Sequence, residues 1–138
     1  MNYLVDTNVL SEPRQKRPQA RVLHWLQANE SNLYTSVLVL GEIRYRIELL
    51  PRNSAKRGDL LRWYETLQLT MAGRVLSINV RVADEWARLQ TEAHSKNVVL
   101  PVVDSLLAAT ARRYGLTIAT DNVSDFNDIG LKVLNPFD

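Results

Sequence analysis

Hydrophobic residues follow two alternating patterns along this chain. Short apolar runs rich in β-branched and aromatic residues predict strands at residues 3–5, 33–35, 75–78, 116–120 and 132–134. Between them, apolar side chains recur every three or four positions, as Val22, Trp25 and Leu26 do. This is the spacing of one helix face, and it predicts helices at residues 21–29, 36–50, 55–71, 80–95 and 102–114, with a short helix beginning at residues 9–11.

Residues with known preferences at helix ends support these boundaries. Ser36 is a good N-cap, and Pro101 stands where proline is tolerated, at the start of a helix. Gly73 and Gly115 follow two of the predicted helices, and Pro13 ends the short first one. Strands that alternate with helices predict an α/β fold with a parallel sheet flanked by helices on both faces. The 138 residues are enough for one domain with its own core.

Composition narrows the class of protein. The chain is 46% hydrophobic and 23% charged, which is typical of a globular domain. No apolar run approaches the roughly 20 residues of a membrane span, and no signal peptide is indicated, so we expect no membrane association and a cytoplasmic location. The absence of cysteine excludes disulfides, thiolate nucleophiles and Cys-ligated zinc.

The basic residues are biased towards arginine. Net charge is only +2, yet 13 of the 17 basic residues are arginine. Two clusters of basic residues stand out, within residues 14–21 and 44–62. Arginine makes planar, bidentate contacts to phosphate, so the bias favours a nucleic-acid or acidic partner. The alternative is that these groups are solvated faces, interrupted by Glu48 and Asp59.

Acidic residues occur in four unusual places. Asp6 ends the first strand, Glu42 lies within an apolar helix, and Asp104 is embedded in a run of leucine, valine and alanine. Asp121 follows the fourth strand, with Asp125 close behind. A lone charge in an apolar setting costs several kcal/mol (order of magnitude), so such acids are usually paired or bound to a cation.

Each acid also has a purely structural interpretation. Asp6 can cap the following helix, and Asp104, in a first helical turn, can complement the helix dipole. Glu42 can point outward from its helix, and Asp121 can be a turn residue. Taken together these alternatives are weaker, because the strand tips and the helix N-termini of a parallel sheet open on one edge. We expect several carboxylates to converge there with no lysine or arginine placed to neutralise them, a set that suits Mg²⁺ or Mn²⁺ and phosphate chemistry.

Other chemistries find no support. His24 and His94 fall on predicted helices without metal-ligand spacing. The chain has no Gly-x-x-x-x-Gly-Lys, no Gly-x-Gly-x-x-Gly and no Gly-x-Ser-x-Gly sequence, so nucleotide-loop and nucleophile-elbow enzymes are not indicated.

Four segments in this order resemble a known family. They are Leu4-Val-Asp-Thr-Asn-Val9, Ser36 with Gly41-Glu42-Ile43, Val103-Asp104-Ser-Leu-Leu-Ala-Ala-Thr-Ala111, and Leu116-Thr-Ile-Ala-Thr-Asp-Asn122 with Asp125-Phe126. The arrangement is similar to the PIN-domain ribonucleases, specifically the VapC and FitB toxins of bacterial type II toxin–antitoxin pairs. The likeness covers essentially the whole chain, and the ending Asn135-Pro-Phe resembles the FitB branch. It implies one PIN domain over residues 1–138.

The resemblance also implies roles for individual residues. Asp6, Glu42 and Asp104 match the first three acidic positions of the family. The fourth acid is Asp125 or Asp121, because some relatives carry an acid where this chain has Asn122 and others carry one just before the phenylalanine. The implied catalytic set is Asp6, Glu42, Asp104 and Asp125; the implied metal ligands are Asp6, Asp104, Glu42 and Asp121; the implied supporting residues are Thr7, Asn8, Thr120 and Asn122, the last orienting a water or ligand.

By the same resemblance, we expect an endoribonuclease that depends on Mg²⁺ or Mn²⁺ and acts as a homodimer. A cognate antitoxin of the VapB or FitA type would inhibit it and would provide the contact to operator DNA. Arginines hold the RNA substrate or receive an acidic antitoxin tail, and the candidates are Arg14, Arg17, Arg44 and Arg46.

Two alternatives belong to other classes of protein. One is a PIN-like binding or regulatory subunit that acts with an antitoxin on DNA and does not turn over RNA, which the departure at the fourth acid leaves open. The other is a Mg²⁺-dependent phospho-receiver module. That module needs an acceptor aspartate after a mid-chain strand and a lysine after a late one, whereas residues 75–78 lead into Asn79 and the only late lysine is Lys132.

Overall fold

The computed structural model describes residues 1–126 and 129–138, and its centre is a five-stranded sheet. The strands lie in the order β3-β2-β1-β4-β5, and every neighbouring pair is parallel. Their bounds are Tyr3–Val5 (β1), Leu33–Ser36 (β2), Val75–Leu76 (β3), Thr117–Ala119 (β4) and Val133–Leu134 (β5). All five predicted strands are present, although β3, β4 and β5 are shorter than their apolar runs.

Helices connect these strands at the predicted places. The α-helices are Thr7–Leu10 (α1), Ala20–Ala28 (α2), Val37–Glu48 (α3), Ala55–Thr70 (α4), Val80–Ser95 (α5) and Val102–Tyr114 (α6). Short 3-10 segments occur at Glu12–Arg14, Glu30–Asn32 and Val123–Asp125. Ser36 caps α3 by accepting from the Leu38 amide at 3.1 Å, and Gly115 ends α6 in the left-handed conformation that favours glycine.

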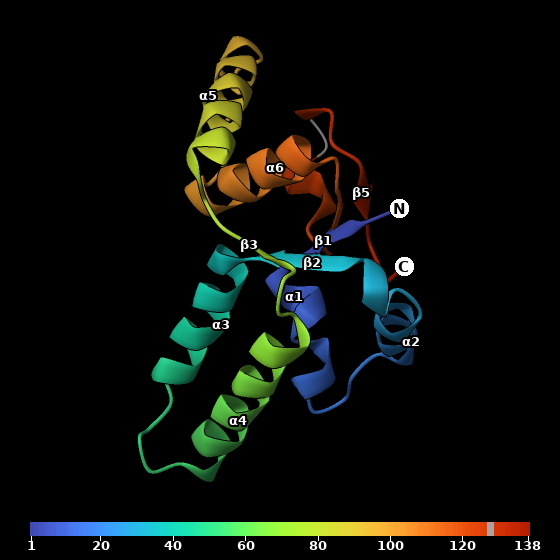
Figure 1. The fold of residues 1–138 in the computed structure, drawn as a ribbon, viewed down its shortest axis with the longest axis vertical. Helices are drawn as coiled ribbons and strands as arrows, with labels where there is room; N and C mark the ends of the chain where they lie inside the picture. Colours follow the sequence, from blue (N-terminus) through green and yellow to red (C-terminus); the bar gives the residue numbers. More distant parts are fainter. Residues whose placement is uncertain (127–128) are drawn as a thin grey trace.

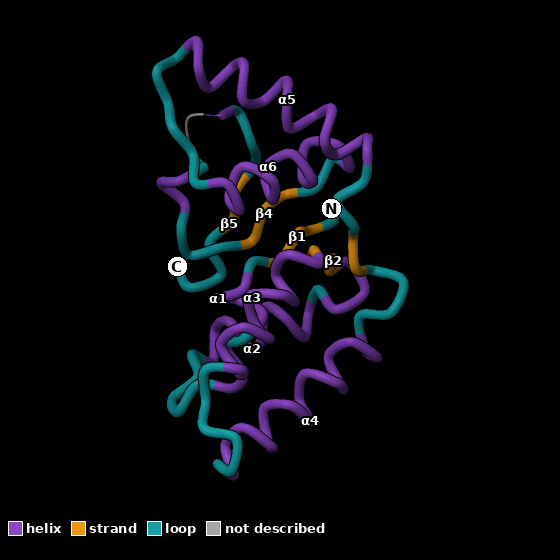
Figure 2. The backbone as a smooth tube through the Cα atoms, turned by 90° about the vertical axis from the view of Figure 1, so that its left-hand side faces the viewer, coloured by secondary structure: helices purple, strands orange, loops and turns teal. Residues whose placement is uncertain are grey.

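Two layers of helices cover the sheet (Figure 1). Helices α5 and α6 lie on one face, and α1 to α4 lie on the other, which the view turned by 90° also shows (Figure 2). The predicted α/β architecture, a parallel sheet with helices on both faces, is confirmed. Among the described residues, no helix is both long enough and apolar enough to cross a bilayer.

The first helix differs from its prediction. It begins at Thr7 rather than at residues 9–11, because Asp6 caps it and the polar residues after β1 already have helical backbone. It ends at Leu10, before Pro13, which stands in the first turn of the following 3-10 segment. The consequence is a short helix that starts at the end of the central strand.

Packing of the two layers is unequal. On the α5–α6 side, Val82, Leu89 and Ala93 are buried, and half-buried Trp86 donates its indole N–H to the Ser105 hydroxyl at 2.9 Å. On the other side, α4 has no fully buried residue, and its apolar side chains are only partly covered. The α4 side therefore leaves hollows between its helices.

Candidate active site

The site lies where the sheet connections change direction. From the central strand β1 the chain crosses to β2 on one side, whereas β4 pairs with β1 on the other, with Val5 opposite Ala119. Loops that leave such a point in opposite directions open a crevice at the carboxyl ends of the strands, where ligands bind in open α/β sheets. The residues that follow the paired positions are Asp6 and Thr120.

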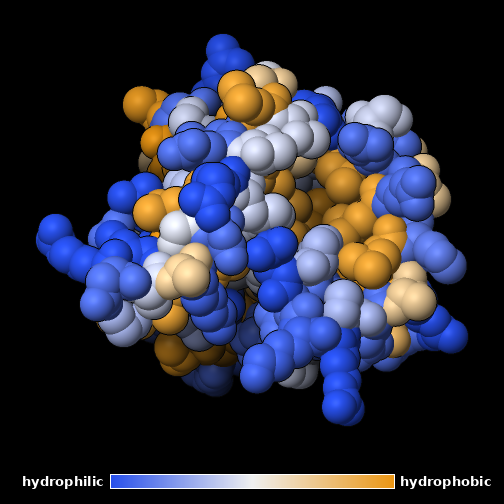
Figure 3. Space-filling model, turned by 90° about the horizontal axis from the view of Figure 1, so that it is seen from below, coloured by the Kyte–Doolittle hydropathy of each residue, from blue (hydrophilic) through white to orange (hydrophobic). Residues whose placement is uncertain are grey.

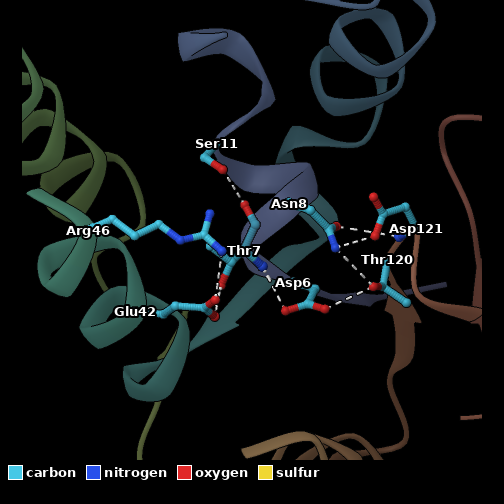
Figure 4. Close-up of polar contacts among 8 residues, drawn as sticks. All are labelled: Asp6, Thr7, Asn8, Ser11, Glu42, Arg46, Thr120 and Asp121. Atoms are coloured by element: carbon cyan, nitrogen blue, oxygen red, sulfur yellow. Dashed lines mark hydrogen bonds and ion pairs between the residues drawn. The ribbon is translucent and has the colours of Figure 1, made fainter. Parts of the chain in front are cut away.

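Asp6 is buried in this crevice and uses both carboxylate oxygens (Figure 4). Oδ1 accepts the Thr7 backbone N–H at 2.8 Å, and Oδ2 accepts the Thr120 hydroxyl at 2.8 Å. Asp6 is therefore the N-cap of α1, as its structural interpretation predicted, and it also faces the crevice. Burial raises the pKa of Asp6, and the nearby Glu42 and Asp121 charges raise it further, while the two hydrogen bonds act in the opposite direction.

Glu42 reaches the site from the second turn of α3. Its Oε2 accepts the Thr7 hydroxyl at 2.6 Å, and its Oε1 accepts from the Arg46 guanidinium at 2.9 Å. The expectation that no lysine or arginine neutralises these acids is thus wrong for Glu42. Residues four apart on a helix share a face, so the spacing of Glu42 and Arg46 already contained this ion pair.

The predicted supporting residues connect the two sides of the crevice. The Asn8 side-chain amide donates to Asp121 and, at 3.5 Å, to the Thr120 hydroxyl, and its oxygen accepts the Asp121 backbone N–H at 3.4 Å. Thr120 is fully buried, and its hydroxyl also accepts the Asn122 backbone N–H at 3.1 Å. These contacts tie the end of β4 to the start of α1 (Figure 4).

Asp104 and Asp125 form the other part of the site. Asp104 lies in the first turn of α6, as predicted, and shares a hydrogen bond with Asp125, whose other contact is the Asn122 side-chain amide. Partial burial, this hydrogen bond and the charges of Asp125, Asp6 and Glu42 raise the pKa of Asp104 to about 6. Of the two candidates for the fourth acid, Asp125 contacts Asp104, whereas Asp121 is exposed and held by Asn8.

These acids are chemically suited to a hard divalent cation. All are oxygen donors, and at Asp6 and Asp104 burial and like charges work against ionisation, which a bound cation would relieve. As the side chains stand, no three acidic or histidine residues among positions 1–126 and 129–138 are grouped tightly enough to hold one ion. Glu42 is held by Thr7 and Arg46, and Asp125 by Asn122, so these two would have to turn to join Asp6 and Asp104 on a shared ion.

The four predicted RNA-binding arginines divide into two groups. Arg14 and Arg46 line a cavity next to the acids. Lys56, a member of the second basic group, lines it too, as does Trp63, which the sequence did not single out. Arg44 instead pairs with Glu48 at 2.7 Å, and Arg17 is exposed in the segment before α2. The position of Lys56 and Trp63 beside the acids is not predictable from the sequence, because both lie on α4, whose place beside α1 and α3 only the tertiary structure shows.

Fold and site together define an α/β domain with an acidic crevice at its topological switch point. The sequence matches the family model described as PIN domain over residues 3–131, and the chain belongs to the PIN-domain family.

The relatives extend along the whole chain. It is 36% identical over 140 residues to plasmid stability protein StbB of Pseudomonas syringae pv. tomato, covering 98% of each chain. It is 31% identical to toxin FitB of Neisseria gonorrhoeae, covering 97% of each, and 30% identical to VapC ribonuclease Y4jK of Sinorhizobium fredii, covering 98% of this chain and 97% of the relative. A solved structure of FitAB bound to an IR36 DNA fragment superposes with a TM-score of 0.92 at 31% identity, covering 99% of this chain and 96% of that one.

Proposed function

We propose that this protein is a metal-dependent endoribonuclease and the toxin of a type II toxin–antitoxin pair. The observation that carries the proposal is Asp6, a buried carboxylate at the switch point of the sheet whose pKa is raised by burial and by neighbouring acids. The names of two relatives, a toxin and a VapC ribonuclease, support the same reading. Such a site would catalyse hydrolysis of the RNA phosphodiester backbone.

Asp6, Asp104, Asp125 and Glu42 are the residues that would hold Mg²⁺ or Mn²⁺. When bound, the cation would lower the pKa of a bound water, so that hydroxide is available for attack at neutral pH, and would offset negative charge on the phosphate. The hydrogen bonds from Thr120 and the Thr7 amide favour the ionised form of Asp6 and fix the direction of its carboxylate. Thr7 and Arg46 hold Glu42 at the edge of the crevice, from which its carboxylate would turn towards the cation.

An antitoxin is the protein partner that we propose. In a solved structure of FitAB bound to an IR36 DNA fragment, one chain shares 31% identity with this protein. By extension, the protein would reach operator DNA only through its antitoxin, and an antitoxin of the VapB or FitA type would inhibit it.

A homodimer is the assembly that we propose. The start of α6 and the segment before it expose Val99, Val102 and Val103, which are 93%, 66% and 44% accessible. Neighbouring exposed valines favour an interface over isolated surface residues. Light scattering of the purified protein should give twice the chain mass of 15.8 kDa, and a mass of one chain would exclude the dimer.

Cleavage of RNA by the purified protein tests the proposed function. We expect cleavage of single-stranded RNA with Mg²⁺ or Mn²⁺, no cleavage with EDTA, and recovery when the cation is restored. Asp6→Asn should abolish cleavage while circular dichroism shows a folded protein, because the amide keeps the cap but loses the charge. Equal cleavage with EDTA would contradict the metal dependence.

A binding subunit without turnover is the second candidate. It is favoured by the ion pair that holds Glu42 and by the absence of a tight group of three acids among the described residues. This candidate would be selected if the wild-type protein cleaved no RNA and its complex with the antitoxin bound DNA.

A further inference from the structure

A cavity of about 230 Å³ lies between α1, α3 and α4, directly beside the acidic crevice. Thr7 lines the cavity and donates its hydroxyl to Glu42, so the two sites share a wall. Arg46 is a second member of both, because it lines the cavity and pairs with Glu42. A linear polymer bound at the acids would therefore pass the mouth of this cavity.

The lining of the cavity is partly cationic and partly apolar. Arg14, Arg46 and Lys56 supply three positive charges, whereas Ile43 and Trp63 are among the apolar lining residues. Among the residues that the structure describes, neither Arg14 nor Lys56 pairs with a carboxylate. Seen from below, the side that carries α1 to α4 has hydrophobic side chains gathered in a hollow with hydrophilic ones around it (Figure 3), and this side also holds a second, more apolar cavity.

A second cavity on the same side provides a contrast. It has about 310 Å³ and also includes Trp63, but its lining is largely leucine with Pro13 and Met71. Its one cation in the described lining is Arg74, which donates to the Glu30, Leu33 and Thr70 carbonyls. An anionic ligand is therefore favoured in the first cavity and not in the second.

We infer that the first cavity is a subsite for one nucleotide of single-stranded RNA, the nucleotide next to the scissile phosphate. Trp63 offers an indole face for its base, and Arg14, Lys56 and Arg46 bind the phosphates on either side. Base stacking on an aromatic side chain combined with cationic contacts to the backbone is how proteins hold single strands without reading their sequence. The cavity volume is below the ~300–1,000 Å³ of drug-sized ligand sites, a size that suits one planar base. This inference rests on the proposed nuclease function.

Binding in EDTA separates the subsite from cleavage. Fluorescence anisotropy with a short fluorescein-labelled RNA of mixed sequence measures Kd over a range of salt concentrations. Lys56→Ala should weaken binding and reduce the slope of log K against log salt by about 0.7, the share of one phosphate contact in a single strand. Trp63→Leu should raise Kd at least about fivefold through lost stacking, while Trp63→Phe retains binding. Arg81→Ala, which removes an exposed charge on α5 across the sheet, should bind like the wild type.

Photocrosslinking locates the base directly. RNA that carries 5-bromouridine should crosslink under ultraviolet light to the peptide that contains Trp63, as identified by mass spectrometry. This readout does not depend on the Trp63→Leu variant being folded. Crosslinks confined to other peptides, with Lys56→Ala binding RNA normally, would overturn the subsite.

Cleavage kinetics distinguish failure of the subsite from failure of the proposed function. If the wild type cleaves, Lys56→Ala should raise KM and leave kcat unchanged, because the contact stabilises the bound substrate and the transition state equally. A wild type that cleaves, with variants equal to it in KM, refutes the subsite alone. A wild type that never cleaves refutes the nuclease function, and with it the placement of this nucleotide next to a scissile phosphate. Normal RNA binding by Lys56→Ala with weakened capture of the cognate antitoxin would give the cavity to the protein partner.

Discussion

The Asp6 carboxylate and the Thr120 hydroxyl meet in a 2.8 Å hydrogen bond, although 114 positions separate them in the chain. The contact exists because β1 and β4 are neighbours and each residue directly follows its strand. The bond lowers the pKa of Asp6 against the larger effect of burial. Thr120 therefore helps to keep a buried acid charged, which is what a cation ligand requires.

Replacing Thr120 by valine tests that role. The change keeps the shape of the side chain but leaves the buried Asp6 oxygen without its donor, which should cost about 1–3 kcal/mol of unfolding free energy. In the wild type this hydrogen bond lowers the pKa of Asp6. Its loss should therefore raise that pKa and move the acid limb of the pH–cleavage profile to higher pH. Thr120→Ser retains the hydroxyl and should keep the wild-type profile. An unmoved acid limb in Thr120→Val would contradict the role.

Asp104 should contribute more to the stability of the metal-free protein in acid than at neutral pH. Its folded-state pKa of about 6 lies above the ordinary value of 3.8, so its stabilising contribution is full below pH ~4 and is lost as pH rises through ~6. Asp104→Asn should then raise the Tm in EDTA at pH 7 by about 2–4 °C, for about 1 kcal/mol after discounting solvent screening at this partly exposed site.

The same variant provides an internal control. At pH 4 its Tm should match that of the wild type, because Asp104 is then largely protonated. Addition of Mn²⁺ should raise the wild-type Tm at pH 7 and leave Asp104→Asn unmoved. A variant that is less stable than the wild type at pH 7 in EDTA would contradict the raised pKa of Asp104. Equal Mn²⁺ stabilisation of both proteins would show that Asp104 does not act as a ligand.

The two candidates for the fourth acid should separate clearly in cleavage assays. Asp125 hydrogen-bonds to Asp104, whereas Asp121 is exposed and serves Asn8. Asp125→Ala should reduce kcat by about 100-fold or more, as expected for loss of charge at the reacting centre. Asp121→Ala should stay within about tenfold of the wild type, as expected for a residue that supports a ligand. The opposite order would move the fourth position to Asp121.

Arg46 should weaken cation binding while it supports RNA binding. Its ion pair with Glu42 is an exposed pair four residues apart, worth about 0.2–1 kcal/mol. Arg46→Gln should therefore tighten Mn²⁺ binding about 1.5- to 5-fold, as measured by calorimetry without RNA, and change the Tm little. Unchanged or weaker Mn²⁺ affinity would mean that Glu42 does not leave Arg46 to reach the ion.

Much of the fold was present in local sequence patterns. The strand at Tyr3–Val5, the cap at Ser36 and the helix end at Gly115 all match their predictions, because apolar periodicity and end preferences act over a few residues. Strand lengths were less predictable: β3 is Val75–Leu76, shorter than its apolar run, because pairing with β2 rather than propensity sets its extent.

The candidate acids could be found from the sequence, but their relations could not. Asp6 and Asp104 are conspicuous as charges in apolar surroundings, and that signal is local. Whether Asp121 or Asp125 adjoins Asp104 depends on how the segment after β4 turns, which a few polar residues do not specify. The Arg46–Glu42 pair lay within reach of helical spacing and was missed.

The sequence by itself determined the alternation of strands and helices, the charged residues at strand ends and the likeness to PIN-domain proteins. Tertiary structure alone decided that β1 lies between β2 and β4, because strand order depends on contacts between distant segments. That order creates the crevice and brings Thr120 to Asp6. Tertiary packing also places α4 where Lys56 and Trp63 line a cavity that shares Thr7 with the acidic site. Asp6 is both cap and crevice acid because the helix it caps starts at the point where the sheet changes direction.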